Sequence, residues 1–441
     1  MDTIAPMRIP RYKRVVDALA ADIRAGRWAV GTRLPTHREL AAREGIALVT
    51  ASRVYAELAM MGLVTGEQGR GTFVRDVVQP QGIDQRSVAA DAVDLSFNYP
   101  TIPGQADMLR QALRELATAG DLDAFLHYQP HRGRAKDRAA VASHLGRRGL
   151  TVTAEQVLIV SGSQHGLATT VMAKLNHGDV VAVDPLTYPG FKVLANSLGL
   201  ELLPFADLDA LEQICAKRAV RAIYTMPTMH NPLSRVLSRA ARDRLVAIAR
   251  RHELLIIEDG SYAYLVEDAP PPLMKLAPES TIYVSSLSKS VATGLRIGFV
   301  AATDTQPIER AIRATTWNTP ALNTAIACRW LDDGTVDRLE AQKRTDARMR
   351  QAIARDVFDG LPFEAHPSSY FLWLPLPESA RADRIAASLA RQHIAVSTAE
   401  PFATTAHVPQ ALRLALGSIG LPELRQTLTE VRRVVDEETY R

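Results

Sequence analysis

One lysine of this chain lies in a setting suited to reversible covalent chemistry. Lys289 stands between two serines in the stretch SSLSKSVATGLRIGFV (285–300), after an apolar run typical of a β-strand. Arg296 follows seven residues later, just before a second apolar run. A lysine amine can attack a carbonyl group reversibly, and an arginine beside it can hold an anion such as a phosphate. The stretch therefore predicts a site for an anionic ligand that carries a carbonyl group.

Polar side chains also follow four earlier apolar runs, at 157–160, 180–183, 222–226 and 254–257, where the chain reads SGSQHG, DPLTYPG, PTMHNPLS and EDGSY. Helical stretches separate these runs, and the alternation predicts an α/β domain with a mostly parallel sheet covered by helices on both faces. Such sheets bind ligands at the carboxyl ends of their strands. A single polar residue at a strand end is usually just solvated, whereas five in succession favour a shared site.

Pyridoxal phosphate is the ligand that these groups suit. Lys289 could hold its aldehyde as an internal aldimine, and a buried carboxylate such as Asp259 would keep its ring nitrogen protonated. Asn231 and Tyr262 could donate to its phenolic oxygen, and Tyr188 could stack on its ring. The alternatives are a helix-capping or solvated Asp259 and tyrosines that only pack in the core.

The phosphate of this cofactor needs a cation and N–H groups. SGSQHG precedes a predicted helix, so it would lie at a helix N-terminus, where free backbone N–H groups bind anions. Small polar residues also cap many helices that bind nothing, which is the alternative. The residues expected around the phosphate are Arg296, Ser286, Ser288, Ser163 and Gln164.

The excess positive charge of the chain is concentrated at its N-terminal end. The 441 residues carry a net charge of +4. The first 76 hold 12 of the 52 lysines and arginines and 8 of the 48 acidic residues, so the remainder balances at 40 of each. A basic segment joined to a neutral body suggests a polyanion partner for that segment alone.

The basic segment predicts three helices and a hairpin. Apolar residues recur at helical spacing over 12–23, and Thr36 and Glu39 form the capping box of a second helix. A third helix is expected from after Gly45 to about Met61, and GLVTGEQGRGTFVRD reads as two short strands around a glycine-rich tip. This order is that of a winged helix-turn-helix, whose third helix enters the major groove of DNA.

Polar residues of this segment are candidate DNA contacts. Thr50, Arg53 and Glu57 share one face of the expected third helix. The side chains that could reach phosphates or base edges are Arg38, Thr50, Arg53 and Arg70. The alternative is a small helical packing module whose arginines are only solvated.

The segment resembles the GntR family of bacterial regulators. The resemblance is carried by GTRLPTHRELA, by TASRVYAEL with GLV, and by GRGTFV, in the order and spacing of the family. The family usually begins its recognition helix with Ser or Thr followed by Arg, where this chain has Ala47 and Leu48. One DNA contact that the resemblance implies is therefore missing.

The remainder of the chain resembles the fold-type I aminotransferases, through SGSQHGL, DPLTYPG, HNP, EDGSY and SSLSKSVATGLRIGF. The resemblance implies a homodimer with shared sites. It implies that Tyr128 reaches the phosphate of the partner subunit's cofactor, and that Arg413 holds the carboxylate of an amino-acid ligand. The family's Asn-Pro-Thr-Gly and Gly-Gly become Asn231-Pro232-Leu233-Ser234 and Ser368-Ser369-Tyr370. Both changes are expected near the substrate.

The expected domains are 1–76 for the winged helix-turn-helix and 92–441 for the aminotransferase-like body, with a linker at 77–91. Within the body we expect a large subdomain at about 120–325 and a small one at about 326–441. This layout resembles the MocR subfamily of GntR-type transcription regulators. It implies a regulator that binds operator DNA and senses a small amine or amino acid by transaldimination at Lys289.

Two other functions remain open. The chain could be an active amino-acid aminotransferase that carries a DNA-binding module, or the cofactor could be purely structural. The two cysteines, Cys215 and Cys328, predict neither a disulfide framework nor a metal site. No apolar stretch approaches the roughly 18 residues of a membrane span, so we expect a cytoplasmic protein.

Overall fold

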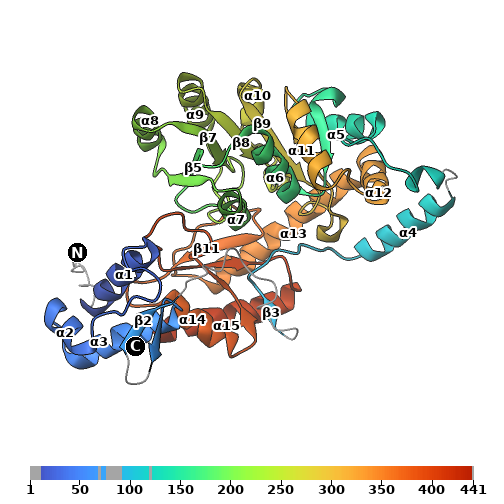
Figure 1. Ribbon diagram of the computed structural model, residues 1–441. Helices are drawn as coiled ribbons and strands as arrows, with labels where there is room; N and C mark the ends of the chain where they lie inside the picture. The colour runs from blue at the N-terminus through green and yellow to red at the C-terminus, as the bar shows by residue number, and fades with distance from the viewer. Residues whose placement is uncertain (1–10, 68–70, 76–91, 119–121, 440–441) are drawn as a thin grey trace.

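The computed structural model describes residues 11–67, 71–75, 92–118 and 122–439. Figure 1 shows an N-terminal helical domain, a large α/β domain and a C-terminal subdomain, with the N-terminal domain beside the C-terminal subdomain. No helix in the described ranges is both long enough and apolar enough to cross a membrane.

The N-terminal domain has the predicted order of three helices and a hairpin. Its elements are α1 (Arg11–Arg24), α2 (His37–Glu44), α3 (Leu48–Met60), β1 (Val64–Glu67) and β2 (Gly71–Val74), and the two strands are antiparallel. The capping box is confirmed, because Thr36 Oγ1 accepts from Glu39 N and Glu39 Oε2 accepts from Thr36 N. Val16, Leu40 and Leu58 are fully buried where the three helices meet.

The large domain contains a seven-stranded sheet in the order β4-β10-β9-β8-β7-β5-β6. Its strands are β4 (Val157–Val160), β5 (Val180–Val183), β6 (Glu201–Pro204), β7 (Val220–Thr225), β8 (Leu255–Asp259), β9 (Thr281–Ser286) and β10 (Gly298–Ala301). Five neighbouring strands are parallel, and β10 runs antiparallel to both β4 and β9. The predicted mostly parallel sheet is therefore confirmed.

Helices cover both faces of this sheet. The helices of the large domain are α5 (Ala135–Arg147), α6 (Ser163–Lys174), α7 (Pro189–Ser197), α8 (Leu208–Lys217), α9 (Arg239–Arg251), α10 (Leu273–Leu276), α11 (Gln306–Thr315) and α12 (Ala321–Asp332). Short 3-10 turns cover Asp123–Phe125, Ala154–Gln156, Ala263–Leu265 and Thr293–Leu295. Along β4, Leu158 packs with α6 and α11, while Ile159 packs with α5 and α12. A strand buried on both faces explains why the run VLIV is apolar without alternation.

The C-terminal subdomain packs helices against a three-stranded antiparallel sheet, β11-β14-β13. Its elements are α13 (Thr335–Val357), β11 (Phe371–Pro375), α14 (Ala382–Ala390), β12 (Ile394–Ala395), β13 (Ser397–Thr398), β14 (Ala411–Ala415) and α15 (Leu421–Thr439). The early strand β3 (Val93–Asp94) pairs with β12 in parallel. The chain therefore crosses this subdomain before α4 (Gln105–Thr118) leads into the large domain.

Candidate ligand pocket and DNA-contact helix

A cavity of about 670 Å³ lies at the carboxyl ends of β4, β7, β8 and β9. The structure brings together at this cavity nearly all the residues that the sequence singled out for the cofactor and its ligand. These are Lys289, Asp259, Asn231, Tyr262, Tyr188, Ser163, Gln164, Ser286, Ser288, Arg296 and Arg413. The parallel strands account for this convergence, because their carboxyl ends share one edge of the sheet.

Lys289 is held through both its side chain and its backbone carbonyl group. Its Nζ donates to the carbonyl oxygen of Asn98 at 2.7 Å. Its own carbonyl oxygen accepts from Tyr264 Oη at 2.9 Å and from Lys343 Nζ at 3.1 Å. Lys343 is fully buried, and burial together with the nearby charge of Lys289 lowers the pKa of Lys343 to about 7. The backbone that presents Lys289 is therefore fixed by two donors from other elements.

Asp259 is a buried carboxylate without a cationic partner in the described chain. It is the last residue of β8, and its side chain accepts from Ser261 N at 2.9 Å, Ser261 Oγ at 2.6 Å and Tyr224 Oη at 3.0 Å. Burial raises the pKa of Asp259, and these hydrogen bonds oppose the rise. A protonated ring nitrogen placed against this carboxylate would stabilise its charged form.

The end of the cavity that suits an anion lies at the N-terminus of α6. Ser163 begins that helix, and its Oγ is 2.8 Å from both Ser261 Oγ and Ser286 Oγ. Arg296 contacts Ser288 Oγ at 3.4 Å and donates to the Ser161 carbonyl oxygen at 3.1 Å. A helix N-terminus, hydroxyls and a guanidinium group form the donor set that a phosphate requires.

Arg413 approaches the cavity from β14 of the C-terminal subdomain. Its NH1 donates to the Ser96 carbonyl oxygen at 3.0 Å, and its guanidinium carbon lies 4.7 Å from the centre of the Phe371 ring. Burial lowers the pKa of Arg413, opposed by its contact with Tyr262. Among the described residues, Arg413 Nε, Asn231 Oδ1 and Gln164 Oε1 are buried without a hydrogen-bond partner. A polar ligand in the cavity would satisfy such groups.

Several cavity residues were not predicted. Ser96, Asn98 and Tyr99 line the wall opposite Lys289, and Phe402 adds an apolar side chain from the C-terminal subdomain. The segment that carries the first three follows β3, which has only two residues. A strand that short leaves no periodic pattern in the sequence, so the polar run SFNY was the only signal available.

The two departures from the aminotransferase pattern lie behind the cavity wall. Ser234 Oγ is 2.9 Å from Ser369 Oγ, and Ser368 Oγ donates to the Leu265 carbonyl oxygen at 2.6 Å. Leu233 packs against an apolar cluster of the C-terminal subdomain. Among the residues that the structure describes, none of these four lines the cavity. They connect the large domain to the C-terminal subdomain.

Tyr128 lies away from the cavity of its own chain. It is 83% exposed, and its ring is 5.9 Å from that of Trp317. The predicted contact of Tyr128 with a second subunit's cofactor therefore stays a prediction.

The candidate DNA contacts lie on exposed parts of α2 and α3. Arg38 is exposed, Thr50 is half-buried, and Arg53 stacks on the Tyr12 ring at 4.2 Å. Arg70 lies outside the described residues. Ala47 occupies the N-cap of α3 and makes no side-chain cap, so the departure at this position removes a cap worth about 1 kcal/mol.

Glu57 lies beside Arg53 on α3, with its Oε1 3.9 Å from Arg53 Nε, but unlike Arg53 it is not exposed. Its side chain is buried against the C-terminal subdomain. The exposed face of α3 instead combines Val49, Ser52, Arg53 and Ala56. No cluster of His, Cys, Asp or Glu suited to a metal ion occurs in the part of the chain that the structure describes.

Comparisons with known proteins match the two parts of the chain to two different families. Residues 90–429 match the family of class I and II aminotransferases, and residues 11–74 match the gntR family of bacterial regulatory proteins. The uncharacterized HTH-type transcriptional regulator YdeF of Bacillus subtilis is 27% identical over 98% of this chain and 95% of its own. TauR, an HTH-type transcriptional regulator of Rhodobacter capsulatus, is 26% identical over 96% of each.

Two enzymes match the larger part of the chain. The 2-aminoadipate transaminase of Thermus thermophilus is 28% identical over 73% of this chain and 83% of its own. The crystal structure of alpha-aminoadipate aminotransferase from Thermus thermophilus, complexed with N-(5′-phosphopyridoxyl)-L-leucine, matches with a TM-score of 0.72 and 24% identity. That match covers 80% of this chain and 95% of the enzyme.

Proposed function

The chain belongs to the family of class I and II aminotransferases and carries a GntR-type DNA-binding domain, and from this premise we propose that it regulates transcription in response to a small amine or amino acid. The observation that carries the proposal is that one chain contains both a ligand cavity and a DNA-binding domain. Its cavity combines Lys289, Asp259 and Arg413, and its third helix leaves a face containing Arg53 open to DNA.

Pyridoxal phosphate is the cofactor, and the residues present fit it. Asp259 supplies the carboxylate for its ring nitrogen, and Arg296 with Ser163 supplies donors for its phosphate. Asn231 Oδ1 and Gln164 Oε1 are buried in the cavity wall without a hydrogen-bond partner in the described chain, so both can accept a hydrogen bond from a ligand. When bound, the cofactor supplies an aldehyde that combines reversibly with primary amines.

Lys289 is the chain's own amine in this cavity. An effector that carries a primary amine competes with Lys289 Nζ, and the displaced Nζ can return to the Asn98 carbonyl oxygen that holds it in the structure. Arg413 orients an effector that carries a carboxylate, because its Nε is buried without a partner. Tyr188 stays a neutral phenol at neutral pH, because burial raises its pKa well above the usual range.

We also propose that the protein acts as a homodimer. Tyr128, Leu126 and Trp317 are exposed apolar or aromatic side chains on the large domain. A second subunit that covers them would bring Tyr128 to the partner's cofactor.

The test is the affinity of the cofactor-loaded protein for its own promoter region, measured with a panel of amines and amino acids. We expect at least one compound to change the affinity fivefold or more, as coupling free energies of about 1–3 kcal/mol imply. Lys289→Ala should abolish that change. A panel without effect on DNA affinity would contradict the proposal.

An active aminotransferase is the second candidate, and the complete set of cofactor contacts favours it. An assay of amino acids against 2-oxo acids separates the two. Sustained turnover of order 1 per second or more would indicate an enzyme, whereas a regulator needs binding alone.

A further inference from the structure

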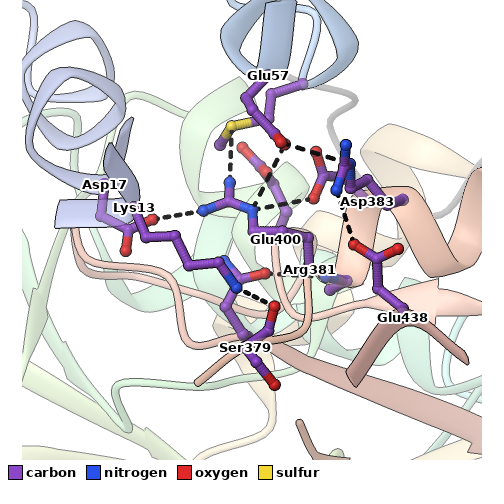
Figure 2. Close-up of polar contacts among 12 residues, drawn as sticks. Lys13, Asp17, Glu57, Ser379, Arg381, Asp383, Glu400 and Glu438 are labelled. Carbon is purple, nitrogen blue, oxygen red and sulfur yellow. Dashed lines mark hydrogen bonds and ion pairs between the residues drawn. The ribbon is translucent and has the colours of Figure 1, made fainter. Parts of the chain in front are cut away.

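The N-terminal domain is seated on the C-terminal subdomain through a group of charged side chains (Figure 2). Arg381 lies at its centre, just before α14, and is only 1% exposed. Its guanidinium group donates to Asp17 Oδ1 of α1 at 2.8 Å and contacts Met61 Sδ, just after α3, at 3.2 Å. Arg381 Nε also lies 3.4 Å from Asp383 Oδ1. One buried arginine therefore joins the C-terminal subdomain to α1 and to the end of α3.

Glu57 brings α3 into the same contact. Its carboxylate is 1% exposed and lies 3.4 Å from Arg384 Nε and 3.9 Å from Arg381 Nε. In the described chain neither of its oxygens has a hydrogen-bond partner. Arg384 is shared, since its NH1 also contacts Glu438 of α15 at 3.0 Å. Buried charges that are incompletely paired recover little of their desolvation cost, so this contact is easily separated.

Two further contacts fix α1. Lys13 Nζ donates to the carbonyl oxygen of Glu378 at 2.9 Å and contacts that of Ser379. Arg24 forms a bidentate pair with Glu400, through Nε–Oε1 at 2.9 Å and NH2–Oε2 at 2.7 Å. A cavity of about 220 Å³ remains between the two parts, lined in part by Arg24, Arg381 and Glu400. The contact is therefore polar and loosely packed.

The contact leaves the DNA-facing side of α3 open. Val49 is 81% exposed, and Ser52, Arg53 and Ala56 are exposed on the same side. Glu57, next to Arg53 on α3, points into the C-terminal subdomain. The seated domain can therefore still meet DNA, and the contact fixes the orientation of α3 without covering it.

The segment 397–404 connects this contact to the ligand cavity. Ser397 in β13 pairs with Arg413 in β14, and Ser397 Oγ contacts the same Ser96 carbonyl oxygen that Arg413 NH1 binds. Three residues later Glu400 holds Arg24. Two residues further Phe402 lines the cavity, and its carbonyl oxygen accepts from Thr187 N at 2.8 Å, next to Tyr188.

Lys192 ties the same segment to the other side of the cavity. It lies on α7 two residues after Gly190, and its Nζ lies 3.4 Å from the Glu400 carbonyl oxygen and contacts that of Ala403. A shift of Arg413 or of α7 on ligand binding would therefore reach Glu400, because the residues that contact Arg413, α7 and Arg24 lie within seven positions of this segment.

We propose that the face of the C-terminal subdomain formed by Arg381, Arg384 and Glu400 is the docking surface of the DNA-binding domain, and that segment 397–404 transmits the occupancy of the ligand cavity to it. This inference rests on the proposed function and names the route of its regulation. The two states are a seated and a released DNA-binding domain, so the effector changes how α3 is presented to the operator.

The test uses the full-length protein loaded with pyridoxal phosphate, with aminooxyacetate as the probe. This compound combines a nucleophilic nitrogen for the aldehyde with a carboxylate for Arg413. Its binding is followed by the visible absorbance of the cofactor, and hydrogen exchange by mass spectrometry reports on α1 and on segment 397–404. We expect the probe to change exchange in both by at least threefold. Loading the cofactor-stripped protein with pyridoxal phosphate is a second probe of the same link.

Glu400→Gln removes the charge that holds Arg24, and it should abolish the response of α1 while probe binding stays within about threefold of wild type. Glu364→Gln is the matched control. It breaks the Arg235 pair, which has the same distances of 2.9 and 2.7 Å but lies away from the domain contact. Unchanged exchange in wild-type α1 with both probes, or an equal response in Glu400→Gln, would overturn the inference. If α1 responds but no amine alters DNA affinity, the proposed function fails and the link stands.

Discussion

The ligand cavity and the domain contact are both lined by polar groups, yet they are built differently. In the cavity, Asp259 accepts three hydrogen bonds of 2.6 to 3.0 Å, and Ser163 lies 2.8 Å from its neighbours. In the domain contact, Glu57 lies 3.4 Å from Arg384 and 3.9 Å from Arg381, and it accepts no hydrogen bond from the described chain. The cavity is preorganised to hold a ligand in one geometry, whereas the contact is suited to open and close.

The largest expected effect comes from a change in the ligand cavity that leaves the domain contact intact. Lys289→Ala removes the only amine that the cavity itself supplies near the Asn98 carbonyl oxygen. We expect it to lose every change of cofactor absorbance that depends on the lysine, and to lose the response of DNA affinity to amines. DNA affinity without effector should stay within about threefold of wild type. Lys275→Ala, at an exposed lysine on α10, is the control and should change neither.

The second effect concerns the domain contact alone. Arg381→Met leaves Glu57 and Asp17 without their central partner, and removing one member of a buried ion pair typically costs about 3–5 kcal/mol. Release of the domain returns both carboxylates to water and limits this cost, so we expect a loss of at most about that size in the free energy of docking, measured as faster hydrogen exchange in α1. The double variant with Glu57→Gln should recover part of the loss. Full additivity of the two changes would show that these side chains do not interact.

Salt should weaken the domain contact more than the ligand cavity, and this effect is smaller than the first two. Raising the ionic strength from about 0.1 M to 1 M shortens the Debye length from about 10 Å to about 3 Å. The Arg24–Glu400 pair is partly exposed and should weaken, whereas the buried groups around Asp259 are screened much less. We expect exchange in α1 to rise severalfold while cofactor retention changes by less than twofold. If α1 exchange and cofactor retention were equally sensitive to salt, the two regions would not differ in the way described.

The smallest effect is a pH dependence of docking. Burial raises the pKa of Glu57 above 4.5, and the charges of Arg384 and Arg381 only partly oppose the rise. The seated domain therefore binds a proton at Glu57 more tightly than the released domain does. Its contribution to docking is complete below the pKa of the released form and is lost as the pH rises through the raised pKa. The ratio of α1 exchange in wild type to that in Glu57→Gln should show this trend, since the ratio cancels the intrinsic pH dependence of exchange.

The cavity was largely predictable from the sequence because local patterns place it. Apolar runs such as VLIV and LLIIED mark the strands, and parallel strands bring the residues that follow them to one edge. Asp259, Asn231 and Lys289 could be assigned together for that reason. Ser96 and Asn98 could not, because β3 pairs with β12 about 300 residues away over only two residues.

The domain contact was not predictable by the same reasoning. Glu57 has helical spacing with Arg53, so the sequence assigned both to one face of the third helix and gave no sign that Glu57 is buried. Its burial depends on Arg381 and Arg384, more than 300 positions later, and a single charged residue carries no periodic signal. Arg381 occupies the loop before α14, where an arginine is ordinarily exposed. Charges that meet across domains are thus visible only in the folded chain.

The central claim is that the cavity and the DNA-binding domain share one equilibrium. The most direct measurement is a titration of the cofactor absorbance with an effector amine, in the presence and absence of operator DNA. Coupling is reciprocal, so DNA should change the affinity for the amine by the same factor, about 5- to 150-fold, by which the amine changes the affinity for DNA. Identical titration curves with and without operator DNA would contradict the account.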